Sequence, residues 1–177
     1  MQNRPPQTPR QPAPDHSAEP GIGLADALAA VVTSARRRAL RDGDRQIDTA
    51  HLLHSLIESD PEVRAAFDGG PQLARVLGYL VQRSIGYGLR WQGAVEDSGA
   101  TPSVTDGGAE GWSPSVASAM AGASRRARDR GREQAGGLDL LAALAADPGS
   151  RAVEVLERAG VDAALLASRI VQVSGRG

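Results

Sequence analysis

Two stretches of this chain repeat one another at a constant spacing of 88 positions. When residues 24–56 are laid on residues 112–144 without a gap, ten of the 33 positions are identical. The identities include a glycine that follows a helical pattern, Gly43 and Gly131, and an LLxxL box that begins at Leu52 and at Leu140. Because a single small repeat cannot cover its own apolar face, the two copies should pack against each other.

Apolar residues in both copies follow the period of an α-helix. From Leu24 and again from Trp112 they recur at offsets of 0, 4, 7, 8, 11 and 15, which places them on one helical stripe. Three shorter helices should follow in each copy. In the first copy these three helices are separated by Asp60-Pro61 and by a break at 69–71. In the second copy the last two helices are expected at 148–159 and 161–173. The sequence therefore predicts an all-α fold, in which two tandem four-helix repeats are related by a pseudo-twofold axis and form one compact domain.

The composition changes along the chain and suggests boundaries for these units. Residues 1–20 contain six prolines and are expected to form a disordered tail. Residues 21–85 and 112–174 are the expected repeats. Between them, residues 86–111 hold seven glycines and four acidic residues and are expected to form a flexible linker.

Several kinds of chemistry are excluded by residue types that the chain lacks. All 20 basic residues are arginine and there is no cysteine, which excludes a lysine Schiff base, a thiolate nucleophile and cysteine-ligated metals. We find no catalytic motif, so we expect neither an enzyme nor a cofactor. The net charge of −1 argues against bulk affinity for nucleic acids. No apolar run is long enough for a membrane span and no signal peptide is evident, so a cytoplasmic location is expected.

The motifs of the repeats resemble those of a known family. The second copy has an aromatic-Ser-Pro start at Trp112, the glycine and leucine box named above, and a Val-Leu-Glu-Arg-Ala-Gly-Val-Asp ending over residues 155–162. The first copy keeps Thr49 and His51 before its leucine box. This order resembles the double N-terminal repeat of the Clp ATPases ClpA, ClpB and ClpC, and it covers most of the chain.

The resemblance implies a non-enzymatic module of the Clp protease system that binds peptide or protein segments. Because no GxxxxGK[ST] motif occurs, the chain resembles a stand-alone ClpC-like N-domain without ATPase modules. Such a protein would act as an adaptor, or as a decoy that sequesters substrates or cyclic peptide antibiotics. Its partners would be Clp subunits, their substrates or those antibiotics. The Ala-rich, all-Arg composition fits an actinobacterial source.

The resemblance also suggests where ligands would bind. Some ClpC-type domains bind phosphoarginine through a glutamate in each repeat, but Ala50 and Leu138 occupy those positions here, so phosphoarginine binding is not expected. A second family surface lies between the first helices of the two repeats. The residues that align there, and that we predict to bind a peptide, are Val32, Arg36, Trp112, Ser115 and Met120. Alternatively, Trp112 and Met120 fill the core.

Two other clusters allow different interpretations. His51, His54 and Glu58 follow helical spacing, but without a further ligand we expect no metal site. The arginine runs at 36–38 and 125–128 would suit a helical protein associated with nucleic acid, which is our alternative function. The near-neutral charge and the five aromatic residues favour solvated helix faces instead.

Overall fold

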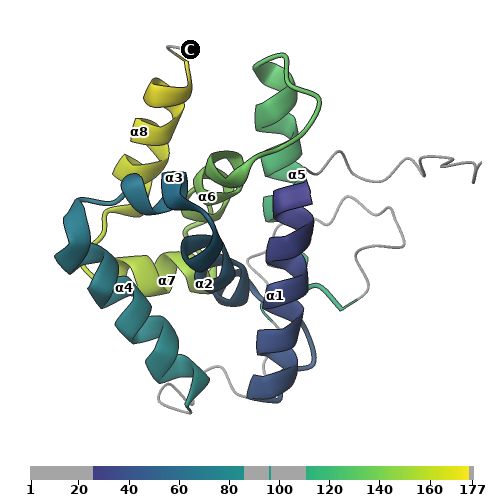
Figure 1. Cartoon of the computed structure of the whole chain (residues 1–177), viewed down its shortest axis with the longest axis vertical. Helices are drawn as coiled ribbons and strands as arrows, with labels where there is room; N and C mark the ends of the chain where they lie inside the picture. The colour runs from purple at the N-terminus through teal and green to yellow at the C-terminus, as the bar shows by residue number, and fades with distance from the viewer. Residues whose placement is uncertain (1–25, 86–95, 97–110, 176–177) are drawn as a thin grey trace, which may run out of the picture.

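The computed structural model of this protein describes residues 26–85, 96 and 111–175, and these residues form eight helices and no strand (Figure 1). The predicted all-α fold is confirmed. The expected tail at 1–20, the start of the first apolar stripe at Leu24 and all but two residues of the expected linker lie outside the described residues. The helices are α1 (Asp26–Asp42), α2 (Thr49–Ser59), α3 (Pro61–Ala65), α4 (Gly69–Ser84), α5 (Pro114–Asp129), α6 (Gly137–Ala145), α7 (Arg151–Arg158) and α8 (Ala163–Ser174).

The helix starts preserve the spacing of the sequence repeat. Helices α1 and α5 begin at positions 26 and 114, and α2 and α6 at positions 49 and 137; both differences equal 88. Gly43 and Gly131, which follow the first helix of each repeat, both have a positive φ that side chains other than glycine rarely adopt. The same local signals therefore end equivalent helices.

Polar side chains cap the helix starts where the sequence indicates. The Oγ of Ser113 accepts the N–H of Val116 at 3.2 Å, and Pro114 follows as the first residue of α5. At the start of α2, the carboxylate of Asp48 accepts the N–H of His51 at 2.9 Å. These caps fix the starts of α5 and α2.

Three helix boundaries differ from the sequence prediction. The expected break at 69–71 is instead the first turn of α4, where proline is tolerated because its missing N–H would have no helical partner. Helix α7 starts at Arg151 rather than at Pro148, because the Oγ of Ser150 accepts the N–H of Val153 at 3.3 Å and caps the helix there. Helix α8 likewise starts at Ala163, capped by Asp162.

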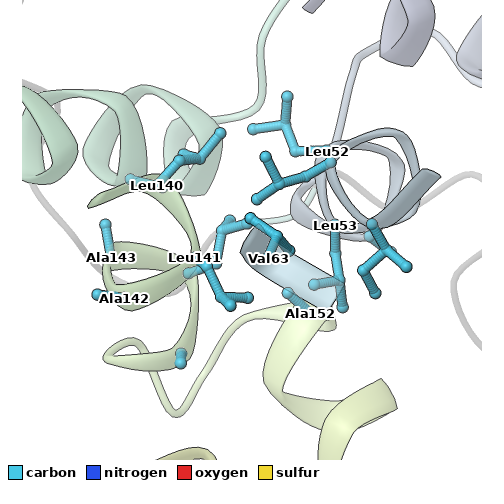
Figure 2. Close-up of a cluster of buried hydrophobic side chains, with 14 of the residues drawn as sticks. Leu52, Leu53, Val63, Leu140, Leu141, Ala142, Ala143 and Ala152 are labelled. Atoms are coloured by element: carbon cyan, nitrogen blue, oxygen red, sulfur yellow. The ribbon is translucent and has the colours of Figure 1, made fainter. Parts of the chain in front are cut away.

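The core forms where α2 meets α6. Figure 2 shows leucines of both helices directed toward each other, with Val63 of α3 and Ala152 of α7 beside them. Every residue of α2 from Thr49 to Ile57 is buried, and so is every residue of α6 from Asp139 to Ala145. Since neither helix exposes a polar face there, each needs neighbours from both repeats.

The last helices of the two repeats pack differently. Helix α8 lies against α6 of its own repeat, whereas α4 contacts α7 of the other repeat more extensively than it contacts α2. The Nε of Arg75 on α4 donates to the carbonyl of Ala159 at 3.1 Å, and Arg169 on α8 pairs with Asp68 before α4. The two repeats therefore interlock, and α4 and α8 occupy one side of the molecule in Figure 1.

The carboxylate of Glu96 joins the two repeats. It accepts the backbone N–H of Thr49 at 2.8 Å, the backbone N–H of Arg151 at 2.8 Å and the hydroxyl of Ser113 at 3.0 Å. Thr49 Oγ1 donates to the same carboxylate and accepts the N–H of Ala152 at 2.9 Å. Thr49 and Arg151 begin α2 and α7, whose first N–H groups have no helical acceptor and favour an anion. One acidic residue from the region between the repeats thus serves both helix starts.

The burial of Trp112 predicts a structural cost for its removal. Trp112 is 8% exposed and belongs to the core. Trp112→Ala should lower the free energy of unfolding by about 3–5 kcal/mol in urea denaturation, whereas Leu40→Ala, at a side chain 73% exposed, should change it by less than about 0.5 kcal/mol. Nearly unchanged stability in Trp112→Ala would contradict the core role.

The shared carboxylate predicts a second effect on stability. Glu96→Ala should lower the free energy of unfolding by about 2–3 kcal/mol, because two helix starts lose their acceptor. Glu157→Ala, which removes an exposed acid from α7, is the matched control and should be nearly neutral. Equal urea midpoints for the two variants would show that Glu96 does not hold the repeats together.

Candidate functional site

The five residues predicted to bind a peptide differ in accessibility. Val32 is partly buried and Arg36 is exposed on α1. Trp112, Ser115 and Met120, at and near the start of α5, are exposed by 8%, 1% and 0% respectively. The structure therefore presents two of the five at the surface and buries the other three.

The backbone around Trp112 explains its burial. The N–H of Ile47 donates to the carbonyl of Gly111 at 2.8 Å, and the N–H of Ser113 donates to the carbonyl of Ile47 at 2.9 Å. These two bonds hold Trp112 against the turn before α2, where Ile47 is also buried. Trp112 and Met120 thus occupy core positions, as the alternative interpretation of the sequence has it.

A hollow that the sequence analysis did not identify lies along α5 and α6. It has a volume of about 430 Å³. We call it the α5–α6 groove, and its lining residues are Ser118, Ala119, Gly122, Arg125, Arg126, Asp129, Ala143, Ala146 and Asp147.

Small side chains make the floor of the α5–α6 groove, and charged side chains border it. At Gly122 a Cβ would lie 3.3 Å from the Cβ of Ala143, so the glycine lets the two helices approach closely. Arg125 and Arg126 stand on α5 together with Asp129, and Asp147 follows α6. A surface with a small apolar floor and both signs of charge suits a peptide segment more than a nucleic acid. The sequence feature that could have indicated the groove lies beside the apolar stripe of α5, where only Ser, Gly and Ala occur before the arginines.

The two positions at which ClpC-type repeats carry a glutamate lack a carboxylate. Ala50 is fully buried and Leu138 is partly buried against the core. Beside Ala50, the carboxylate of Glu96 already occupies the N–H groups at the starts of α2 and α7. The polar groups at this junction therefore hydrogen-bond within the chain.

The histidines of α2 belong to two separate clusters. His54 Nε2 lies 3.2 Å from Glu58 Oε1, and Arg38 reaches across from α1 to both residues. Burial and the positive charge of Arg38 lower the pKa of His54, against the opposing effect of Glu58. His51 instead faces the turn between α1 and α2. The three residues considered together in the sequence are thus not brought to one site.

Asp48 anchors the cluster around His51. Its carboxylate pairs with Arg83 of α4 and accepts from Arg151 Nη1 of α7 at 2.8 Å. Burial raises the pKa of the Asp48 carboxyl, but its hydrogen bond with His51 and the charge of Arg83 outweigh this and hold the pKa well below its usual range. The stabilisation is therefore present above the usual aspartate range and is lost only in strong acid.

The helices of the described residues include none that is long and apolar enough to cross a membrane.

Comparison with known proteins finds a sequence family for the second half of the chain and similar folds for most of it. Residues 112–177 match the model of the Clp repeat N-terminal domain, and no curated protein sequence matches the chain. In fold, the chain is similar to the N-terminal domain of the caseinolytic protease associated chaperone ClpD from Arabidopsis thaliana. That similarity has a TM-score of 0.60 and 16% identity, and covers 88% of this chain and 97% of that one. A structure from a study of a malarial protein secretion system is similar with a TM-score of 0.57 and 14% identity, over 86% and 95% of the two chains. Residues 112–177 therefore match the Clp repeat N-terminal domain family by sequence, and the described part of the chain has the fold of a Clp N-terminal domain.

Proposed function

We propose that this chain is a non-enzymatic module of the Clp protease system that binds protein or peptide segments. The observation that carries the proposal is the coincidence of the family match and the α5–α6 groove, because both lie in residues 112–177. The similar ClpD domain comes from a chaperone associated with caseinolytic protease, which supports a place for this chain in the same system.

The α5–α6 groove suits a peptide better than the five residues that the sequence analysis predicted to bind one, because three of those five are buried. Val32 and Arg36 add a partly buried apolar side chain and a cation on α1. Trp112, Ser115 and Met120 would act from beneath, by fixing the position of α5. Ligand binding along α5 would then depend on these buried residues without direct contact.

Within this function we favour an adaptor-like or decoy role in the cytoplasm. A binding module that offers a peptide surface could present substrates to a Clp ATPase, or it could sequester substrates or cyclic peptide antibiotics. Both roles need only reversible binding, which the small-residue floor and charged border of the groove provide.

Closing the α5–α6 groove tests the proposal. Ala146 is exposed and lines the groove, so Ala146→Trp should fill it without disturbing the core. In affinity capture from the native cytosol, wild-type protein should recover Clp subunits or their substrates. Recovery with Ala146→Trp should fall about tenfold, as expected when a central contact is lost.

A matched control separates the groove from a general effect of an added aromatic ring. Ala164 is exposed on α8, away from the groove, and Ala164→Trp should recover the same proteins as the wild type. Capture of nucleic acid alone would favour the arginine-rich alternative. Equal recovery by the two tryptophan variants would contradict the placement of the site.

Phosphoarginine provides a test of ligand choice. Since Ala50 and Leu138 offer no carboxylate to the guanidinium group, calorimetry with free phosphoarginine should detect weak or no binding. Leu138→Glu, which adds a carboxylate at a partly buried position, should bind more tightly if the missing acid is the cause. Sub-micromolar affinity of the wild-type chain would show that another residue replaces it.

A further inference from the structure

Two carboxylates and one imidazole nitrogen meet at the turn between α1 and α2. His51 Nε2 lies 3.5 Å from Asp42 Oδ2 and 3.1 Å from Asp44 Oδ2. One ligand atom from each of the three residues lies within 4.8 Å of the others. Asp42 ends α1, Asp44 lies in the turn and His51 lies in the first turn of α2, so the local chain path alone assembles the group.

The imidazole nitrogen in this group is buried without a hydrogen bond. The side chain of His51 is 1% exposed, and its Nε2 has no hydrogen-bond partner among the described residues. A buried polar atom in a native protein normally has a partner. The unpartnered Nε2 lies close to two carboxylates, an arrangement in which a bound cation would give Nε2 a partner.

The second repeat carries the same arrangement with inverted charges. At a spacing of 88 positions, Asp42, Asp44 and His51 correspond to Arg130, Arg132 and Asp139. Both arginines pair with the buried carboxylate of Asp139. In the second repeat, two arginines therefore neutralise the carboxylate of Asp139. In the first repeat, two carboxylates instead surround the imidazole of His51.

We propose that Asp42, Asp44 and His51 bind a divalent transition-metal ion of the Zn²⁺ type. Imidazole and carboxylate ligands suit this class of ion. Two ligands of a tetrahedral zinc ion lie about 3.4 Å apart, since each is about 2.0–2.1 Å from the metal, and the distances of 3.1 and 3.5 Å bracket this value. Water would complete the coordination.

The surroundings of the imidazole fit this role. Asp48 Oδ1 lies 3.0 Å from His51 Nδ1, so it can accept the Nδ1 proton while Nε2 binds the metal, an arrangement that is usual for metal-binding histidines. This bond would replace the one that Nδ1 now accepts from the backbone N–H of Asp48 at 3.1 Å. Asp44 is 28% exposed and provides access from solvent.

The neighbouring groups set the charge balance. Arg83 Nη2 lies 3.3 Å from Asp44 Oδ2 and Ser84 Oγ donates to Asp42 Oδ2 at 3.2 Å, so both carboxylates are shared. Three aspartates face two arginines, Arg83 and the Arg151 that pairs with Asp48. With a neutral His51 the cluster keeps one negative charge, which a metal ion or a second proton on the imidazole would offset.

Zinc titration by calorimetry distinguishes a bound metal ion from a bound proton. In a His16→Gln/His54→Gln chain, His51 is the only histidine, and this chain should bind one Zn²⁺. Adding Asp44→Asn should weaken binding by at least about tenfold. Asp26→Asn, which removes an exposed acid at the start of α1 outside the cluster, is the matched control and should leave zinc binding unchanged. Circular dichroism verifies that each variant keeps its helices.

Nitrogen NMR of the wild-type chain gives a readout that needs no variant. On addition of ZnCl₂, the Nε2 signal of His51 should shift and the imidazole proton should move to Nδ1. The proposal is overturned if no heat appears up to about 100 µM zinc, a concentration that should fill such a site. It is also overturned if Asp44→Asn binds zinc as well as Asp26→Asn does, or if Nε2 of His51 keeps its proton in the presence of zinc.

Discussion

The packing of α2 against α6 is the constraint on which the rest of the fold depends. Both helices are buried on all sides over most of their length, and a helix without a solvent-exposed face is stable only when other helices surround it. One repeat has three further helices, and α4 turns away to contact α7 of the other repeat. Each central helix is therefore completed by the partner repeat, and the two halves should fold as one unit.

The sequence predicted those parts of the fold that local signals specify. The repeat indicated that Leu52 and Leu140 are core positions. The proline that follows Ser113 indicated that Ser113 caps a helix. The starts of α4 and α7 could not be predicted from the sequence, since a proline fits either a break or a first helical turn. The role of Glu96 could not be predicted, because two helix starts far apart in sequence meet at that carboxylate only in the folded chain.

The candidate site shows the same division. Trp112 and Met120 were placed at a ligand surface through the resemblance, yet they stand at offsets 0 and 8 of the apolar stripe of their helix. That stripe is the face that packs into the core, so the periodicity indicated their burial before the structure did. The α5–α6 groove depends on the close approach of two helices at Gly122, which a one-dimensional pattern does not specify.

The charges around the third residue of α2 and of α6 form two sets of opposite sign. His51 and Asp139 occupy equivalent positions, and in each repeat the turn before the helix carries charges opposite to those in the other repeat. Arginine stays charged under all ordinary conditions, so the set in the second repeat is permanent. On the proposal of a metal site, the set in the first repeat is complete only when a cation binds. The first repeat, whose charges would then depend on the bound cation, contacts the second repeat through Asp48 and Arg151. The second repeat, whose charges stay constant, carries the α5–α6 groove.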